Sequence, residues 1–197
     1  YGTERSQAEQ VLKEKYSVDI SKADQNEVGI GNVYLMFDQI DGNRLTAVCA
    51  GTPLMMDDMD PAQDYPVLEQ EMLDILNAER RCRGLAPLAA DKTVAACAKA
   101  HSADMGERNY FDHSNPDGED IGDRMKKQEI PFVMAGENIA AGYMNIIFAH
   151  SQLLNSPEHR ENLLGDFQYA GIGIAENVDS KYRYYYTQNF YTPQANL

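Results

Sequence analysis

The sequence predicts an α+β protein in which helices cover an antiparallel sheet, preceded by a small helix-plus-hairpin segment. Apolar residues recur at spacings of three and four through most of residues 64–155, which is the period of amphipathic helices. From residue 170 to 191 the chain is instead rich in Ile, Tyr, Thr and Phe, which are common in strands. Because helices and strands occupy separate stretches of the sequence, the pattern indicates the α+β class.

The composition of the chain argues against a nucleic-acid-binding protein and against a membrane-spanning helix. The chain has 197 residues, 43% of them hydrophobic, which is enough for one packed domain with a small appendage. Its formal net charge of −14 disfavours binding to nucleic acid, because the phosphate backbone is repelled. The longest uncharged stretch, residues 138–157, contains Asn, His, Ser and Gln, so we expect no membrane span.

We assign residues 1–57 to a small N-terminal segment. Residues 3–16 carry the pattern of a short amphipathic helix. Two apolar runs between residues 33 and 49 flank Asp41 and Gly42, and an Asp-Gly pair between apolar runs indicates a hairpin. A segment of about 50 residues has a marginal core, so we expect it to pack on the rest of the chain or on a partner.

An acidic linker that contains prolines is expected at residues 53–66, and residues 62–197 are assigned to the main domain. Its first helix is expected to begin at Asp64, with Pro66 in the first turn, and to stop at Gly84. Pro157 is expected to end the last helix. The other elements expected are helices over residues 91–106, 121–128 and 145–155 and antiparallel strands over residues 170–175 and 182–191.

The three cysteines leave at least one thiol free in a monomer. Two interpretations stay open: a bridge between Cys82 and Cys97, or three thiols, Cys49 included, that are buried as small hydrophobic groups. The chain starts at Tyr1 without a signal-like apolar segment, so an export signal was either removed or never present. The compartment must therefore be argued from other features.

Two of the four histidines lie among turn-forming residues, where function often concentrates. They are His113 and His159, and Glu137 stands between them in the sequence after a glycine. Two imidazoles and a carboxylate suit a divalent transition metal or proton transfer, provided that folding brings them together. His101 and His150 fall on apolar helical stripes, so we expect both to be core histidines with satisfied hydrogen bonds.

Seven short segments of the main domain form an ordered set of motifs. They are residues 77–88, which include NAER, then 101–105 (HSADM), 109–118 (NYFDHSNPDG), 136–140 (GENIA), 155–164 (NSPEHRENLL), 171–174 (GIGI) and 186–190 (YTQNF). In this order they resemble the bacterial SCP-like branch of the CAP superfamily, which holds the cysteine-rich secretory, antigen 5 and pathogenesis-related proteins. The resemblance covers about residues 67–191, and the N-terminal segment resembles, more faintly, a CAP-associated region.

The resemblance implies a three-layer α-β-α sandwich and an exported or cell-surface protein. It also implies a central cleft lined by two histidines and two acidic residues, of which His113, Glu137 and His159 match by motif. We expect Glu137 to orient one histidine and to cap the helix that follows it. Where eukaryotic members carry the second acidic residue, this chain has Ser156, and Leu153 stands at the place of a tryptophan.

Three functions are compatible with these residues. The first is a secreted binding module whose cleft, lined by His113, Glu137, Ser156 and His159, holds Zn²⁺ or another divalent cation, or a small ligand, and engages an unidentified extracellular ligand or protein. In that cleft the metal ligands would be His113 and His159. The second is a metal-assisted peptidase or esterase with Glu137 as the base, or a variant with Ser156 as nucleophile and His159 as base. The third is a structural, wall-associated protein with a vestigial cleft.

Overall fold

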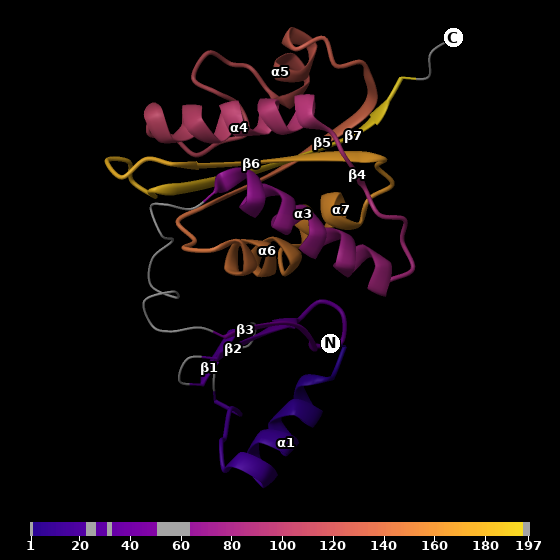
Figure 1. Ribbon diagram of the computed structural model, residues 1–197, viewed down its shortest axis with the longest axis vertical. Coiled ribbons are helices and arrows are strands. Elements are labelled where there is room, and N and C mark those ends of the chain that lie inside the picture. Colours follow the sequence, from indigo (N-terminus) through magenta and orange to yellow (C-terminus); the bar gives the residue numbers. More distant parts are fainter. Residues whose placement is uncertain (1, 23–26, 31–32, 51–63, 195–197) are drawn as a thin grey trace.

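The computed structural model describes residues 2–22, 27–30, 33–50 and 64–194. In the main domain, a four-stranded sheet lies between two layers of helices (Figure 1). Helices α4 and α5 cover one face, and helices α3, α6 and α7 cover the other. The predicted three-layer α-β-α sandwich is therefore confirmed. Its elements are α3 (Tyr65–Cys82), β4 (Ala89–Ala90), α4 (Lys92–Glu107), α5 (Ile121–Lys127), β5 (Phe132–Ala141), α6 (Ile146–Leu154), α7 (Pro157–Leu164), β6 (Tyr169–Glu176) and β7 (Tyr184–Pro193).

The sheet has the strand order β4-β6-β7-β5, so β7 is central and β5 forms one edge. The pair β6·β7 is antiparallel, as expected, and β5, which the sequence did not reveal, also pairs antiparallel with β7. The short strand β4, which the sequence did not reveal, pairs in parallel with β6. The sheet is thus mixed at that edge.

Two glycines in β6 allow helix α4 to pack directly on the sheet. A Cβ atom added to Gly171 would lie 2.2 Å from the backbone nitrogen of Ala95, and one added to Gly173 would lie 2.0 Å from that of Lys99. Distances this short exclude any side chain at both positions. The glycines of the GIGI segment therefore set the spacing between α4 and the strand it covers.

The helix boundaries around Pro157 differ from the expected ones. Helix α6 ends at Leu154, as expected, but Pro157 does not simply end it, because a further helix, α7, begins at this proline. Proline suits the first turn of a helix, where its missing N–H has no partner to lose. His159 consequently lies in the first turn of a helix and not in a loop.

The cysteines do not form the bridge that the sequence left open. Cys82 is exposed and Cys97 is buried, and both are free thiols. The alternative of buried hydrophobic thiols holds for Cys97 and is wrong for Cys82. The side chain of Cys49 lies outside the described residues. In the described part of the chain, no helix combines the length and the apolar character that crossing a bilayer requires.

The N-terminal segment contains helix α1 (Arg5–Tyr16) and a three-stranded antiparallel sheet of β1 (Glu27–Ile30), β2 (Val33–Asp38) and β3 (Arg44–Ala50). The predicted helix and hairpin are confirmed, and β1 was not predicted. Apolar residues of α1 and the sheet, Phe37 and Val28 among them, form a small core of their own. The linker expected at residues 53–66 falls mostly outside the described residues.

A fully buried carboxylate joins the N-terminal segment to the main domain. Both oxygens of Asp38 accept hydrogen bonds from the guanidinium of Arg160, each at 2.9 Å, and Asp38 also forms an ion pair with Arg83. Beside it, Asn155 accepts a hydrogen bond from the N–H of Gln39 at 2.8 Å and donates one to the carbonyl of Phe37 at 3.0 Å. The N-terminal segment thus contacts Asn155, just before Ser156, and Arg160, just after His159.

We predict that Asp38→Ala lowers the free energy of unfolding by about 3–5 kcal/mol, because it leaves the largely buried Arg160 without its carboxylate and removes one of the carboxylates that pair with Arg83. Urea unfolding measures the change. The control is Asp41→Asn, which removes an exposed carboxylate 3.6 Å from Arg83 and is expected to cost less than about 1 kcal/mol. Equal losses in the two variants would contradict the proposed role of Asp38.

Candidate functional site

Glu137 is the centre of the candidate site. It lies in the edge strand β5, and its side chain is only 2% exposed. One carboxylate oxygen accepts a hydrogen bond from Nδ1 of His113 at 3.0 Å, and the other accepts one from Arg124 at 2.6 Å. The ring of His101 lies 3.8 Å from the same oxygen that His113 contacts. A buried carboxylate is thereby compensated by one guanidinium and one imidazole.

The loop that carries His113 is fixed from two helices. His101, on α4, contacts the carbonyl of Asp112 through Nε2 at 3.1 Å. Arg124, on α5, donates to the carbonyl of His113 at 2.9 Å and to that of Glu119 at 2.8 Å. The imidazole of His113 is therefore held in place although its side chain is 54% exposed.

His159 is held on the other side of β5 by helix α7. Its Nδ1 lies 2.7 Å from the hydroxyl of Ser156, one turn earlier. Asn138 donates to the carbonyl of His159 at 3.0 Å, and Asn162 donates to the carbonyl of Glu137 at 3.1 Å and to the side chain of Asn138 at 2.9 Å. Two asparagines thus fasten α7 to the strand that carries Glu137.

The pKa values of the two cleft histidines are shifted in opposite directions. The hydrogen bond to Glu137 raises the pKa of His113 above its ordinary value. Burial, assisted by the positive charge of His113, lowers the pKa of His159. His113 therefore carries the larger share of positive charge, and the two rings are close enough to influence each other's titration.

A groove with a volume of about 280 Å³ begins at His159 and Ser156. Its other walls are mainly apolar and come from the loop before His113, from β5 and from α6. They are formed by Phe111, Ile139, Ala140, Ala141, Tyr143, Gln152 and Leu153. The groove has a polar end at His159 and Ser156 and an apolar continuation along β5.

The structure brings the three predicted residues together around strand β5, and it corrects one detail. Glu137 orients His113, as expected, but it caps no helix, because it lies inside a strand. Ser156, at the position of the second acidic residue, contacts His159. Sequence reasoning missed Arg124, which stands among other basic residues of a short helix and carries no signal that distinguishes it from Lys126 or Lys127.

The two histidines expected in the core differ from each other. His101 is buried and hydrogen-bonded, as predicted, and burial lowers its pKa. His150 is buried too, but neither of its ring nitrogens has a hydrogen-bond partner among the residues that the structure describes. The expectation of a satisfied core histidine is therefore wrong for His150.

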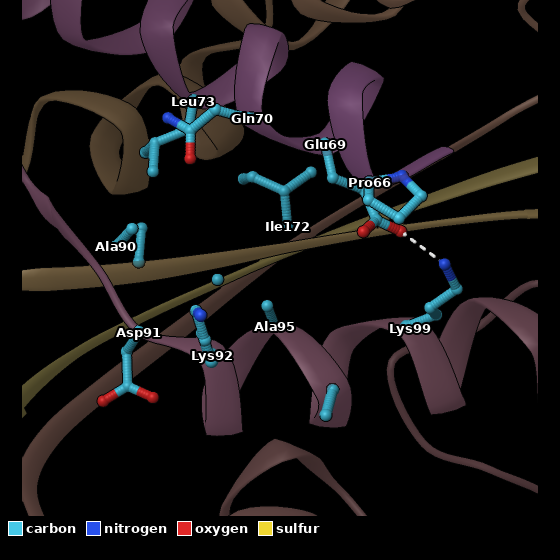
Figure 2. Close-up of a pocket in the computed structure, with 13 residues that line it drawn as sticks. Pro66, Glu69, Gln70, Leu73, Ala90, Asp91, Lys92, Ala95, Lys99 and Ile172 are labelled. Atoms are coloured by element: carbon cyan, nitrogen blue, oxygen red, sulfur yellow. Dashed lines mark ion pairs between the residues drawn. The ribbon is translucent and has the colours of Figure 1, made fainter. Parts of the chain in front are cut away.

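A larger groove of about 400 Å³ lies away from these residues, between α3, α4 and β6 (Figure 2). Leu73 and Ile172 project into it, and Glu69 and Lys99 form an ion pair at 3.1 Å across it, drawn as the dashed line. Glu69 also accepts a hydrogen bond from the N–H of Ile174, and Asp91 caps α4. Because its acidic groups have structural partners, we place the functional site at the His113–His159 cleft.

Comparison with known proteins gives a consistent family assignment. Residues 73–190 match the model of CAP, the cysteine-rich secretory protein family. The uncharacterized protein YkwD of Bacillus subtilis (strain 168) is 39% identical over 110 residues, which are 55% of this chain and 43% of that protein. The uncharacterized membrane protein YlbC of the same organism is 42% identical over 123 residues, 62% of this chain and 34% of that protein. The chain thus spans less than half the length of these relatives.

Solved structures show the same fold. An extracellular protein with an SCP domain from Bacillus anthracis str. Ames superposes with a TM-score of 0.72 and 31% identity, over 84% of this chain and 59% of that one. An outer surface protein from Borrelia burgdorferi gives a TM-score of 0.62 at 22% identity, over 69% of this chain and 100% of that one. At this lower identity the second likeness concerns the fold alone.

We predict that His113→Ala raises the pKa of His159, because it removes a neighbouring positive charge that opposes protonation. Glu137→Gln is expected to lower the pKa of His113, because the imidazolium loses its anionic acceptor. Titration of the imidazole resonances by NMR measures both values. Lys126→Ala, which removes an exposed cation elsewhere, serves as the control. A pKa of His159 that is the same with and without His113 would show that the two rings do not share a cleft.

Proposed function

Because this chain belongs to the CAP family, the cysteine-rich secretory protein family, we propose that it is an exported binding module that holds an extracellular ligand in the cleft between His113 and His159. Export is supported by the likeness, at 31% identity, to a Bacillus anthracis protein described as extracellular. Residues 62–197 would form the CAP/SCP-like binding domain, and residues 1–57 an accessory segment docked on it through Asp38.

One observation carries the proposal. His113 and His159 both use Nδ1 for a contact with the protein, with Glu137 and Ser156 respectively. In each ring this leaves Nε2 as the nitrogen without a protein hydrogen bond among the described residues. Two oriented rings with an available nitrogen, next to an apolar groove, make a recognition site with a polar end and an apolar end.

The charges favour a ligand with a carboxylate. His113 holds the larger share of positive charge, because Glu137 raises its pKa. The negative charge of Glu137 is already balanced by Arg124. An anionic group at the Nε2 side of His113 would therefore meet a net positive partner, while an apolar tail would lie along Ile139 and Leu153 in the groove.

A divalent cation fits this cleft only through two protein ligands. Imidazoles whose Nδ1 is hydrogen-bonded by a neighbouring group resemble metal-binding histidines. However, no group of three or more His, Cys, Asp or Glu side chains in the described ranges is arranged to hold a metal. We therefore propose that Zn²⁺ binds at His113 and His159 without the three protein ligands that catalytic zinc sites use.

The hydrolase alternative gains no support from the geometry. Glu137 would have to accept a proton from water, but it is buried and each of its oxygens already accepts a hydrogen bond. Ser156 contacts His159, but its backbone conformation is ordinary extended chain and the next residue, Pro157, has no N–H to stabilise an oxyanion. The contact between Ser156 and His159 orients the imidazole.

We predict that hexanoate perturbs the imidazole resonances of His113 and His159 in the full chain, whereas hexan-1-ol, of similar length without the charge, perturbs them less. His113→Ala should remove the preference for the carboxylate, because His113 supplies the positive charge. Leu153→Gln, which makes one wall of the groove polar, should weaken both probes. Equal responses to hexanoate in the wild type and in His113→Ala would contradict the assignment of the polar end.

We also predict that Zn²⁺ affinity, measured by isothermal titration calorimetry, falls at least about tenfold in His113→Ala and in His159→Ala. Ser156→Ala should weaken binding by about tenfold, because the group that orients His159 is lost. Affinity should fall as the pH drops towards about 6.5 and below, because only neutral imidazole binds metal, and the raised pKa of His113 makes this loss begin at higher pH. Zinc binding that persists unchanged in the double variant of His113 and His159 would place the metal elsewhere.

A further inference from the structure

A second cavity lies at the junction of the N-terminal segment and the main domain, on a different side of α6 from the cleft. Its volume is about 310 Å³. Strand β3 and helices α3 and α6 form its walls. The lining residues are Thr46, Ala47, Val48, Ile75, Ala78, Glu79, Ile147, His150 and Ser151.

Two of these residues are buried, and their polar atoms lack partners in the part of the chain that the structure describes. His150 is 5% exposed and Ser151 is 3% exposed. Neither ring nitrogen of His150, nor the hydroxyl oxygen of Ser151, forms a hydrogen bond with a described residue. Buried polar atoms almost always have a partner, so three unpartnered ones in the lining of one cavity indicate that a partner from outside the chain belongs there.

The charges around the cavity are already balanced. Glu79 forms an ion pair with Arg83, and Arg83 also pairs with Asp38. Burial, together with the positive charge of Arg83, lowers the pKa of His150 to about 4, so its ring is neutral at physiological pH. A neutral imidazole offers one donor and one acceptor, and a serine hydroxyl offers both. The hydroxyl of Thr46 donates to the carbonyl of Met36, and the other lining residues, Val48, Ile75 and Ile147 among them, are apolar.

We propose that this cavity is a binding site for a small, uncharged and largely apolar molecule with one group, such as a hydroxyl, that both donates and accepts a hydrogen bond. Its polar group would pair with His150 and Ser151, and its apolar part would contact Val48, Ile75 and Ile147. An ionic ligand is excluded because the polar groups of His150 and Ser151 are neutral and because the described lining residues include no unpaired charge. The cavity volume is at the lower end of the range for small-molecule pockets, about 300–1,000 Å³.

The site depends on both parts of the chain. Strand β3 supplies one wall, and the contact between the rings of Tyr34 and Phe148, with centroids 5.4 Å apart, holds the hairpin against α6. The site is independent of the cleft, since it shares no lining residue with the groove at His159. A failure of the cleft proposal therefore leaves this inference intact, and the reverse also holds.

The test uses the full chain and three probes of similar size: 4-methylphenol, toluene and 4-methylbenzoate. We expect 4-methylphenol to shift the ring nitrogen resonances of His150 and to bind about tenfold more tightly than toluene, which lacks the hydroxyl. The charged 4-methylbenzoate should not compete for the site. The resonances of His101, which is buried but hydrogen-bonded, serve as an internal control and should not move.

Three variants separate the contributions. His150→Phe and Ser151→Ala should each remove most of the preference for 4-methylphenol over toluene. Ala78→Leu, at the exposed rim of the cavity, should block both probes without changing His150 or Ser151. This variant keeps the test valid if His150→Phe or Ser151→Ala does not fold. The proposal is overturned if 4-methylphenol leaves the His150 resonances unchanged, or if its advantage over toluene persists in Ser151→Ala and His150→Phe.

Discussion

The ion pair between Asp38 and Arg160 is the interaction on which the arrangement of the two parts of the chain depends. Asp38 has no exposure to solvent, so its charge is tolerated only because Arg160 and Arg83 surround it. Arg83 ends the first helix of the main domain and Arg160 lies one residue after His159. One carboxylate from the N-terminal segment thereby fixes the distance between two helices of the main domain. The same contact holds strand β3 close enough to α6 to close the junction cavity.

The second constraint is that both carboxylate oxygens of Glu137 accept hydrogen bonds from other side chains. A carboxylate that serves as a base needs access to water, whereas Glu137 is buried and each of its oxygens already accepts a hydrogen bond, one from His113 and one from Arg124. Its function in this geometry is to orient His113 and to stabilise its charged form. The contact of Ser156 with His159 has the same consequence for the orientation of the other ring. A cleft whose polar groups are oriented but not activated is suited to recognition.

Sequence reasoning located the helices and the two C-terminal strands because their apolar periods are regular. It missed β5, since Gly136, Glu137 and Asn138 interrupt the alternation of an edge strand. It read Pro157 only as a helix terminator, because a proline at a boundary fits the end of one helix and the start of the next equally well. Family motifs brought His113, Glu137 and His159 together, but the partnership of Glu137 with Arg124 joins residues of different elements, and no local pattern encodes it.

The periodicity of apolar residues predicted that His150 is buried, but it could not predict whether the ring has hydrogen-bond partners. The apolar stripe of α6 correctly placed its side chain inward, but burial alone does not reveal whether an imidazole has partners. The cost of the unpartnered ring falls on the folded state, and it is tolerated because α6 is held from both sides: Leu153 packs in the main core, and Phe148 meets Tyr34 of the hairpin. A helix so constrained cannot turn to expose His150 to water. The polar atoms of His150 and Ser151 therefore stay at the junction cavity, where they have no partner among the described residues and where the proposed ligand would pair with them.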